Sequence, residues 1–293
     1  MRLPQQIYKS ATTDSTRWTS YNHRPGDILI CTPPKCGTTW MQTIVASLLW
    51  PEGTFPGLVM QIGRWFDGVI YDHDETLARL EAQTHRRYIK THTPADGIPI
   101  FDTASYIVVG RDGRDAFMSY ANHMAKMRAE RREQLNAQAV AQGLDPMMEF
   151  RGDIHAFFDR WITEAPVMHH IATWWELRSE PNVLFVHYND LKANLEQEMR
   201  RVAAFLNIPV PTELWLEVVD RCTFSRMRAD AKKVGDFDRL VEGGAQSFLF
   251  QGTNGRWQGV LTTEELQRYQ RRVDELLPLE AAQWLEHGSS GRG

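Results

Sequence analysis

The sequence predicts a single α/β domain with a central parallel sheet that helices cover on both faces. Four short runs of mostly apolar, often β-branched residues alternate with helical patterns, as in a chain built from strand–helix–strand units. Each run is almost continuously apolar, which is typical of a parallel strand buried on both sides. No repeat or long linker divides the 293 residues, so one domain is favoured over two.

The expected strands lie at residues 27–31, 87–91, 105–110 and 182–187. The helical patterns that follow these strands lie at residues 38–49, 114–126, 157–178 and 191–206. Residues 128–142 are rich in Arg, Glu, Gln and Ala, a pattern typical of a solvent-exposed helix, and a lid over a site is the other interpretation. Residues 228–255 hold five glycines and little periodicity, so we expect loops there.

The two ends of the chain are expected to lie outside the domain. We predict an N-terminal arm over residues 1–23, the domain over 24–286 and a disordered tail over 287–293. The first residues are polar and lack the apolar centre of a signal peptide. No apolar run approaches the roughly 18 residues that a membrane span needs.

Composition narrows the possible compartments and partners. The three cysteines, Cys31, Cys36 and Cys222, have no paired spacing, which favours neither a disulfide framework nor a zinc site and indicates a reducing cytoplasm. The net charge of −4 argues against a protein that coats nucleic acid, so we expect no such partner. A basic cleft for a small anion is compatible with this net charge.

Each predicted strand is followed by a side chain suited to chemistry on an anion. In open parallel sheets, ligands bind at the carboxyl ends of the strands. There the four strands are followed, in chain order, by Lys35, His92, Arg111 and Tyr188. Two anion binders, a base and a hydroxyl donor are therefore expected to converge on one site.

The end of the first strand has the features of a phosphate-binding loop. Gly37 permits a tight turn and a close approach of the backbone, and the first N–H groups of the next helix favour an anion. Lys35, Thr38 and Thr39 add further donors. The loop is P-loop-like but departs from G-x-x-x-x-G-K-[ST], because the lysine precedes the glycine. An ordinary strand–turn–helix with a threonine cap is the alternative.

Five segments, taken in order, resemble motifs of the cytosolic sulfotransferases, and together they cover most of the chain. PPKCGTTW resembles the phosphosulfate loop of that family, and the others are YIKTH, VVGRDGRDAFMSY, HYNDLKAN and GTNGRW. We expect the chain to be a bacterial-type member of the family. The resemblance implies that 3′-phosphoadenosine 5′-phosphosulfate donates a sulfuryl group. A hydroxyl or amine accepts it, and adenosine 3′,5′-bisphosphate is the product.

The resemblance also implies catalytic roles. His92 corresponds to the general base, and an imidazole suits that task near neutral pH. Lys35 would neutralise charge that develops on the leaving phosphate. Lys90 either assists or is a solvent-exposed strand lysine. No cluster of ligands has metal spacing, so we expect no metal.

The family pattern implies a larger set of donor-binding residues. Arg111 and Ser119 would bind the 3′-phosphate, whereas Trp40 and Phe224 would stack on the adenine. Each residue has an alternative, purely structural role. For Arg111 it is an ion pair with a neighbouring aspartate, and for the others it is packing in the core. We expect core packing for the pair Trp174 and Trp175. The complete set is Lys35, Cys36, Gly37, Thr38, Thr39, Trp40, Arg111, Ser119, Tyr188, Cys222, Phe224, Phe248, Gln251 and Gly252.

The chain departs from the family pattern at several positions. Cys36 replaces a serine, which weakens one donor. Phe250 and Gln251 stand where the family has an Arg–Lys pair on the 3′-phosphate, and the sequence leaves open whether Arg256 compensates. The dimer motif is not retained, so the oligomeric state stays open.

The acceptor is the least determined part of the prediction: a small molecule, a lipid or a glycan. Apolar side chains that either line its pocket or belong to the core are Trp65, Phe66, Tyr71, Phe117, Met118, Met124 and Phe157. Two other functions are weighed. A P-loop-like kinase lacks its GK–Ser/Thr sequence here, and a nucleotide-binding protein without catalysis is favoured by Phe250–Gln251 but opposed by Lys35 and His92.

Overall fold

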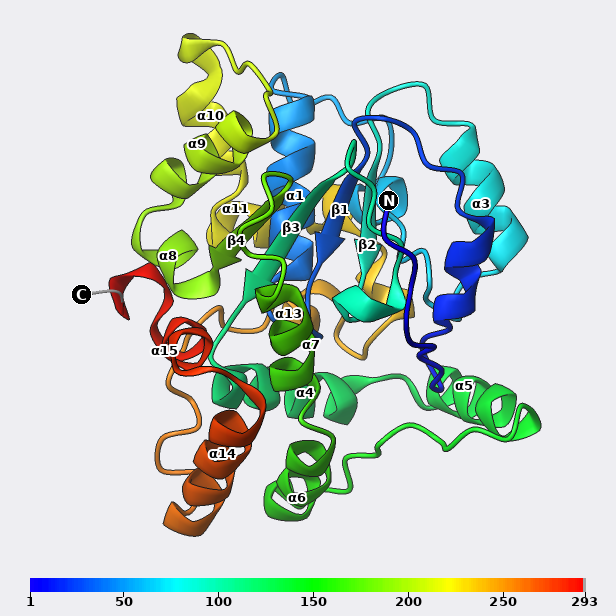
Figure 1. The fold of residues 1–293 in the computed structure, drawn as a ribbon, viewed down its shortest axis with the longest axis vertical. Coiled ribbons are helices and arrows are strands. Elements are labelled where there is room, and N and C mark those ends of the chain that lie inside the picture. Colours follow the sequence, from blue (N-terminus) through cyan, green and yellow to red (C-terminus); the bar gives the residue numbers. More distant parts are fainter. Residues whose placement is uncertain (292–293) are drawn as a thin grey trace.

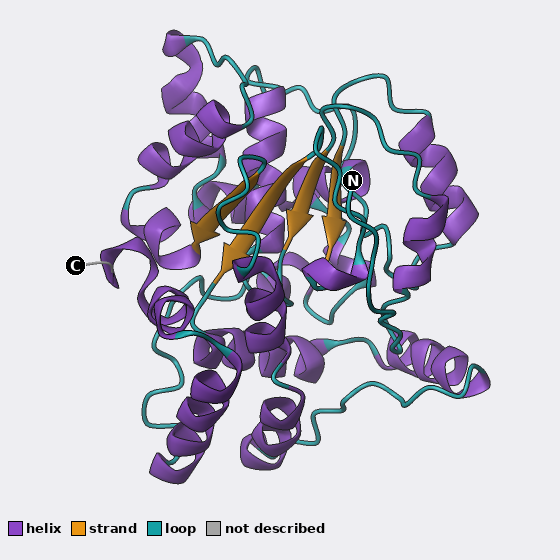
Figure 2. Ribbon diagram, in the orientation of Figure 1, coloured by secondary structure: helices purple, strands orange, loops and turns teal. Residues whose placement is uncertain are grey.

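Four parallel strands form the centre of the molecule, in the order β2-β1-β3-β4. The computed structural model describes residues 1–291. All four strands run in one direction, so their carboxyl ends share one edge of the sheet (Figure 2). The order reverses between β1 and β3, the position at which such sheets open a ligand crevice. The strands are β1 (Ile28–Cys31), β2 (Tyr88–Thr91), β3 (Ser105–Gly110) and β4 (Val183–His187).

Helices cover both faces of this sheet, because neighbouring strand residues point to opposite sides. Leu29 and Val108 face a core formed with α4, α6, α7, α14 and α15. Ile30 and Val109 face a second core, formed with α1, α2, α9, α10 and α12. The predicted α/β class and both-sided covering are confirmed (Figure 1). The helices are α1 (Thr38–Leu49), α2 (Val59–Ile62), α3 (His73–Glu81), α4 (Gly113–Lys126), α5 (Ala129–Ala141), α6 (Ile154–Glu164), α7 (Pro166–Trp175), α8 (Tyr188–Ala193), α9 (Leu195–Phe205), α10 (Trp215–Arg221), α11 (Phe224–Ala229), α12 (Ala231–Val234), α13 (Gly244–Phe248), α14 (Thr263–Leu276) and α15 (Leu279–His287).

Two predicted helices are wrong in that each is broken into two. Residues 157–178 were expected to be continuous, but Ala165 adopts a left-handed conformation and Pro166 then begins α7. Proline suits the first position of a helix and disrupts its interior, which explains the break. The pattern at 191–206 is divided at Asn194, whose side chain accepts a hydrogen bond from the Gln197 N–H and thereby caps α9.

Both ends of the chain are more integrated than expected. Trp18 and Tyr21 of the N-terminal arm are buried in the core, and the Trp18 indole donates to Asp67 at 2.9 Å. His287 ends α15, and a 3-10 helix follows over Gly288–Gly291 where we expected a disordered tail. Arg292 and Gly293 lie outside the described residues.

Other predicted segments are resolved as follows. The expected loops at 228–255 contain the short helices α12 and α13. The Arg-rich run is a helix, α5, which lies at the periphery beside the end of α4 (Figure 1) and buries Leu135 and Ala139. Across residues 1–291, no helix combines the length and apolar character that a bilayer crossing requires.

Candidate functional site

A cavity of about 560 Å³ lies at the carboxyl edge of the sheet. Loops after β1, β2 and β3 line it, together with parts of α4, α8 and α11 and residues 248–253. No aspartate or glutamate occurs among its lining residues within the described chain. Six cationic side chains line it: Lys35, Lys90, Arg111, Arg131, Lys192 and Arg256. A cavity with this excess of positive charge favours a polyanionic ligand.

The loop between β1 and α1 presents a helix N-terminus to this cavity. Gly37, with φ of 106°, is the N-cap of α1, and a Cβ there would lie 3.2 Å from the Tyr188 ring. The backbone conformation therefore favours glycine strongly, and the close packing against Tyr188 leaves little room for a side chain. The first N–H groups of the helix, at Thr38 and Thr39, have no carbonyl partner one turn earlier, which makes this end suited to an anion. Thr38 also exchanges a hydroxyl hydrogen bond of 2.5 Å with Thr32.

Two cysteines of the predicted donor-binding set do not line the cavity. The Cys36 thiol is fully buried and lies 3.9 Å from the Pro34 carbonyl. The backbone N–H of Cys36 donates to the Pro33 carbonyl. The left-handed conformation of Lys35 turns the chain so that side chain 36 enters the core. Cys222 is also buried, but its carbonyl accepts the Trp40 indole N–H at 2.7 Å and so holds that ring in place.

His92, at the end of β2, is held in one orientation. Its Nδ1 lies 2.6 Å from the Thr32 carbonyl and donates to it, which leaves Nε2 as the acceptor. Burial, together with the charge of Lys90, holds the pKa of His92 well below its usual range. The Trp65 ring stands edge-on to the imidazole with centroids 4.7 Å apart. His92 is therefore a neutral imidazole with a free lone pair, the state that a general base needs.

Two lysines beside His92 are partly desolvated. Burial lowers the pKa of Lys35 to about 7, with repulsion from Lys90 as the next cause. Burial also lowers the pKa of Lys90 to about 8. Lys35 lies over the Phe248 ring at 4.5 Å, and Lys90 lies over the Trp65 ring at 4.8 Å. Neither ammonium forms an ion pair within residues 1–291, so an incoming anion would stabilise both charges.

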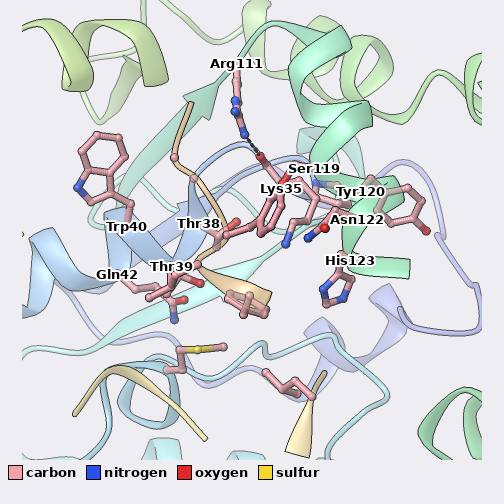
Figure 3. Close-up of a pocket in the computed structure, with 18 of the residues that line it drawn as sticks. Lys35, Thr38, Thr39, Trp40, Gln42, Arg111, Ser119, Tyr120, Asn122 and His123 are labelled. Atoms are coloured by element: carbon pink, nitrogen blue, oxygen red, sulfur yellow. Dashed lines mark hydrogen bonds between the residues drawn. The ribbon is translucent and has the colours of Figure 1, made fainter. Parts of the chain in front are cut away.

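Arg111, at the end of β3, connects two loops at the cavity. It is 5% exposed, and it donates to the Lys35 carbonyl at 3.3 Å (Figure 3). It also donates to Asn254 Oδ1 at 2.9 Å. The alternative of an ion pair with a neighbouring aspartate is wrong. Asp112 pairs with Arg114, whereas Asp115 accepts the Gly255 N–H at 2.8 Å. The guanidinium charge therefore remains available to a ligand.

Aromatic rings form another part of the cavity wall. Trp40 stands edge-on to Tyr188, with ring centroids 5.2 Å apart. In Figure 3, Trp40 and Tyr120 lie on opposite sides of the view. Phe224 begins α11 and packs against Gly252, where a Cβ would lie 2.8 Å from the ring. Trp40 and Phe224 both line the cavity. The expected core position of Trp174 is confirmed, since that residue is fully buried.

The remaining predicted donor-binding residues differ in exposure. Ser119 on α4, Tyr188 on α8 and Phe248 on α13 all line the cavity. Gln251 lines it too, but is an exposed residue. The structure thus brings together every member of the predicted site except the side chains of Cys36 and Cys222.

The apolar lining of the cavity agrees less well with the prediction. Trp65, Tyr71 and Met124 line it, but Phe66, Phe117 and Phe157 belong to the core, and Met118 packs against that core. Phe117 on α4 packs against Phe157 on α6, and Phe66 lies in the same core. Lining residues that the sequence did not indicate include Thr12, Met60, Ile70, His123, Met127, Arg131, Leu135 and Met147.

Comparison with known proteins identifies the family. The sulfotransferase domain model matches residues 25–280. Proteins named glycolipid sulfotransferase from Mycobacterium bovis and Mycobacterium tuberculosis are each 32% identical over 97% of this chain and 95% of their own. The mouse sulfotransferase SULT7A1 complexed with PAP has a TM-score of 0.70 at 17% identity, covering 92% of this chain and 91% of that one. Retinol dehydratase in complex with androsterone and PAP gives 0.69 at 19% identity, covering 88% and 82%. The chain is therefore a member of the sulfotransferase family, as its motifs predict.

Proposed function

We propose that this sulfotransferase uses 3′-phosphoadenosine 5′-phosphosulfate as donor and an apolar, lipid-type alcohol as acceptor. The observation that carries the proposal is the cavity itself: lined by six cations and, within the described residues, by no carboxylate, with a neutral histidine at its wall. A Mg²⁺-dependent kinase would need carboxylates to hold its metal, so this lining favours the metal-free sulfuryl donor.

The donor is assigned along the cavity by charge and shape. Its 5′-phosphosulfate would lie at the N-terminus of α1, where Thr39 and Lys35 donate. Its 3′-phosphate would lie against Arg111 and Ser119, and its adenine against Trp40 and Phe224. Both groups of contacts belong to one continuous cavity, which supports a single bound nucleotide.

The chemical step needs one base and one cation. His92 Nε2 takes the proton of the acceptor hydroxyl while its oxygen bonds to sulfur. The bond from sulfur to the bridging oxygen breaks, and adenosine 3′,5′-bisphosphate leaves with the electron pair. Lys35 stabilises the negative charge on that oxygen, and Lys90 adds positive potential. The hydrogen bond from Nδ1 to the Thr32 carbonyl supports this role, because it fixes the tautomer and stabilises the imidazolium that forms.

The acceptor assignment rests on the apolar end of the cavity. Met60, Met127, Leu135 and Met147 supply flexible or branched apolar surface to the cavity lining. Relatives named glycolipid sulfotransferase at 32% identity support an acceptor with a lipid part. We place the enzyme in the cytoplasm, in keeping with its three free cysteines.

A transfer assay tests the proposal. The purified chain is incubated with ³⁵S-labelled donor and a panel of glycolipids, steroids, phenols and free sugars, with His92→Ala as the matched inactive control. We expect label on at least one apolar alcohol and little on free sugars. Phosphate transfer from Mg·ATP in place of sulfate transfer would contradict the proposal in favour of a kinase. Tight binding of adenosine 3′,5′-bisphosphate without turnover on any acceptor would favour a binding protein.

A further inference from the structure

The 3′-phosphate of the proposed donor needs more positive charge than Arg111 alone supplies. A phosphate monoester carries close to two negative charges at neutral pH. The two positions expected to supply further cations hold Phe250 and Gln251, and Phe250 is 40% exposed. Gln251 offers at most a neutral hydrogen bond, which is weaker than a charge-assisted one.

Arg256 is a second guanidinium on the same cavity. Arg256 is half-buried, and like Arg111 it lines the cavity. It takes part in no ion pair within residues 1–291, and its guanidinium lies 5.5 Å from the centroid of the Phe250 ring. Burial and then the charge of Arg111 lower the pKa of Arg256, whereas the Asp115 carboxylate acts in the opposite direction.

The loop that carries Arg256 is fastened to the neighbourhood of Arg111. Arg111 donates to the Thr253 carbonyl at 3.1 Å and to Asn254 Oδ1 at 2.9 Å. Asn254 in turn donates to Asn189 Oδ1 of α8 at 2.6 Å. The Gly255 N–H donates to Asp115 in the first turn of α4. Residues 253–255 are thus tied to β3, α4 and α8, and this fixes the loop that leads into Arg256.

We propose that Arg256 supplies the second cation for the 3′-phosphate in this chain, in place of the two positions now held by Phe250 and Gln251. The inference rests on the proposed donor. Repulsion between Arg111 and Arg256 in the free protein is relieved when a dianion lies between them. The Phe250 ring shields one face of the Arg256 guanidinium from water, which strengthens its attraction for phosphate. Arg256 thereby becomes a specificity-determining residue for nucleotides with a 3′-phosphate.

Calorimetric binding of two nucleotides tests this inference. Adenosine 3′,5′-bisphosphate and adenosine 5′-monophosphate are titrated into the wild type, Arg256→Gln and Arg256→Lys. For Arg256→Gln we expect bisphosphate affinity to fall at least about tenfold, the scale of a lost charge-assisted hydrogen bond, with monophosphate affinity nearly unchanged. Arg256→Lys should retain most of the preference, and the salt dependence of bisphosphate binding should become shallower in Arg256→Gln only.

A matched control separates local from general electrostatics. Arg239→Gln removes the same charge from an exposed arginine that pairs with Asp236 and does not line the cavity, so it should change neither affinity. Adding Gln251→Lys to Arg256→Gln should restore part of the preference. An equal loss for both nucleotides in Arg256→Gln, or no loss, would overturn the inference while leaving the donor intact. A wild type that does not prefer the bisphosphate would instead overturn the proposed function.

Discussion

The two ends of the cavity are built differently. At the donor end, Lys35, Gly37 and Arg111 belong to motifs in the loops that follow β1 and β3, although Arg111 also donates to the Lys35 carbonyl across these loops. At the proposed acceptor end, Met60 of α2 and Leu135 of α5 line the same cavity although they come from distant segments of the chain. Recognition of charge is therefore encoded in short motifs, whereas the shape of the acceptor pocket depends on the whole fold. The predictions below change the base, the donor end or the acceptor end, so that the effects on the different parts of the cavity can be compared.

The largest effect is expected at the base between the two ends. His92→Ala should lower turnover by about 10²–10⁴, the usual range for loss of a general base, and leave affinity for adenosine 3′,5′-bisphosphate within a few-fold. Steady-state kinetics and calorimetry on the same preparation check both parts. Turnover close to wild type would show that another group takes the proton.

A loss of the next size is expected at the donor end. Lys35→Ala should lower turnover by about 10²–10³, because it removes a charge that acts mainly on the leaving oxygen. Affinity for adenosine 3′,5′-bisphosphate, which lacks the sulfuryl group, should fall much less. Equal losses in turnover and affinity would instead identify Lys35 as a binding residue only.

The pH profile should show the same asymmetry. His92 stays neutral far below pH 6.5 because burial depresses its pKa, so the base should remain functional in mild acid. Lys35 and Lys90, with pKa values of about 7 and about 8 in the free protein, lose their charge as pH rises through that range. The ratio kcat/KM for the donor should therefore decline from pH 7 to pH 9. A profile that instead rises through this range would contradict the assignment of charged lysines to the donor.

The smallest effect is expected at the acceptor end. Met147→Ala removes apolar surface from the cavity wall, so KM for an apolar acceptor should rise a few-fold through lost apolar contact. Affinity for adenosine 3′,5′-bisphosphate should stay at the wild-type value. If the nucleotide is affected as strongly as the acceptor, the two ends of the cavity are not separable.

The same contrast explains what could be predicted from the sequence. The strands, α1 and the side chains at the strand ends could be predicted from the sequence, because a local pattern encodes each of them. The break at Ala165 was missed because apolar spacing continues across it, although Pro166 was a signal that could have located it. Cys36 was misplaced because a motif fixes neighbours in sequence but does not say which way each side chain points. Met147 and Arg131 carry no motif, and only the packing of α5 against the domain places them at the cavity.

The central claim is that the desolvated Lys35 and Lys90, which form no ion pair within residues 1–291, bind an anionic nucleotide. Measuring proton uptake on nucleotide binding tests this claim most directly. Calorimetry at pH 8 in buffers of different ionisation enthalpy counts the protons bound with adenosine 3′,5′-bisphosphate. An anion raises the pKa values of Lys35 and Lys90 from about 7 and about 8, so both should gain protons on binding. The account predicts net uptake of about one proton in the wild type and less in Lys35→Met. Zero uptake or net release in the wild type would contradict it.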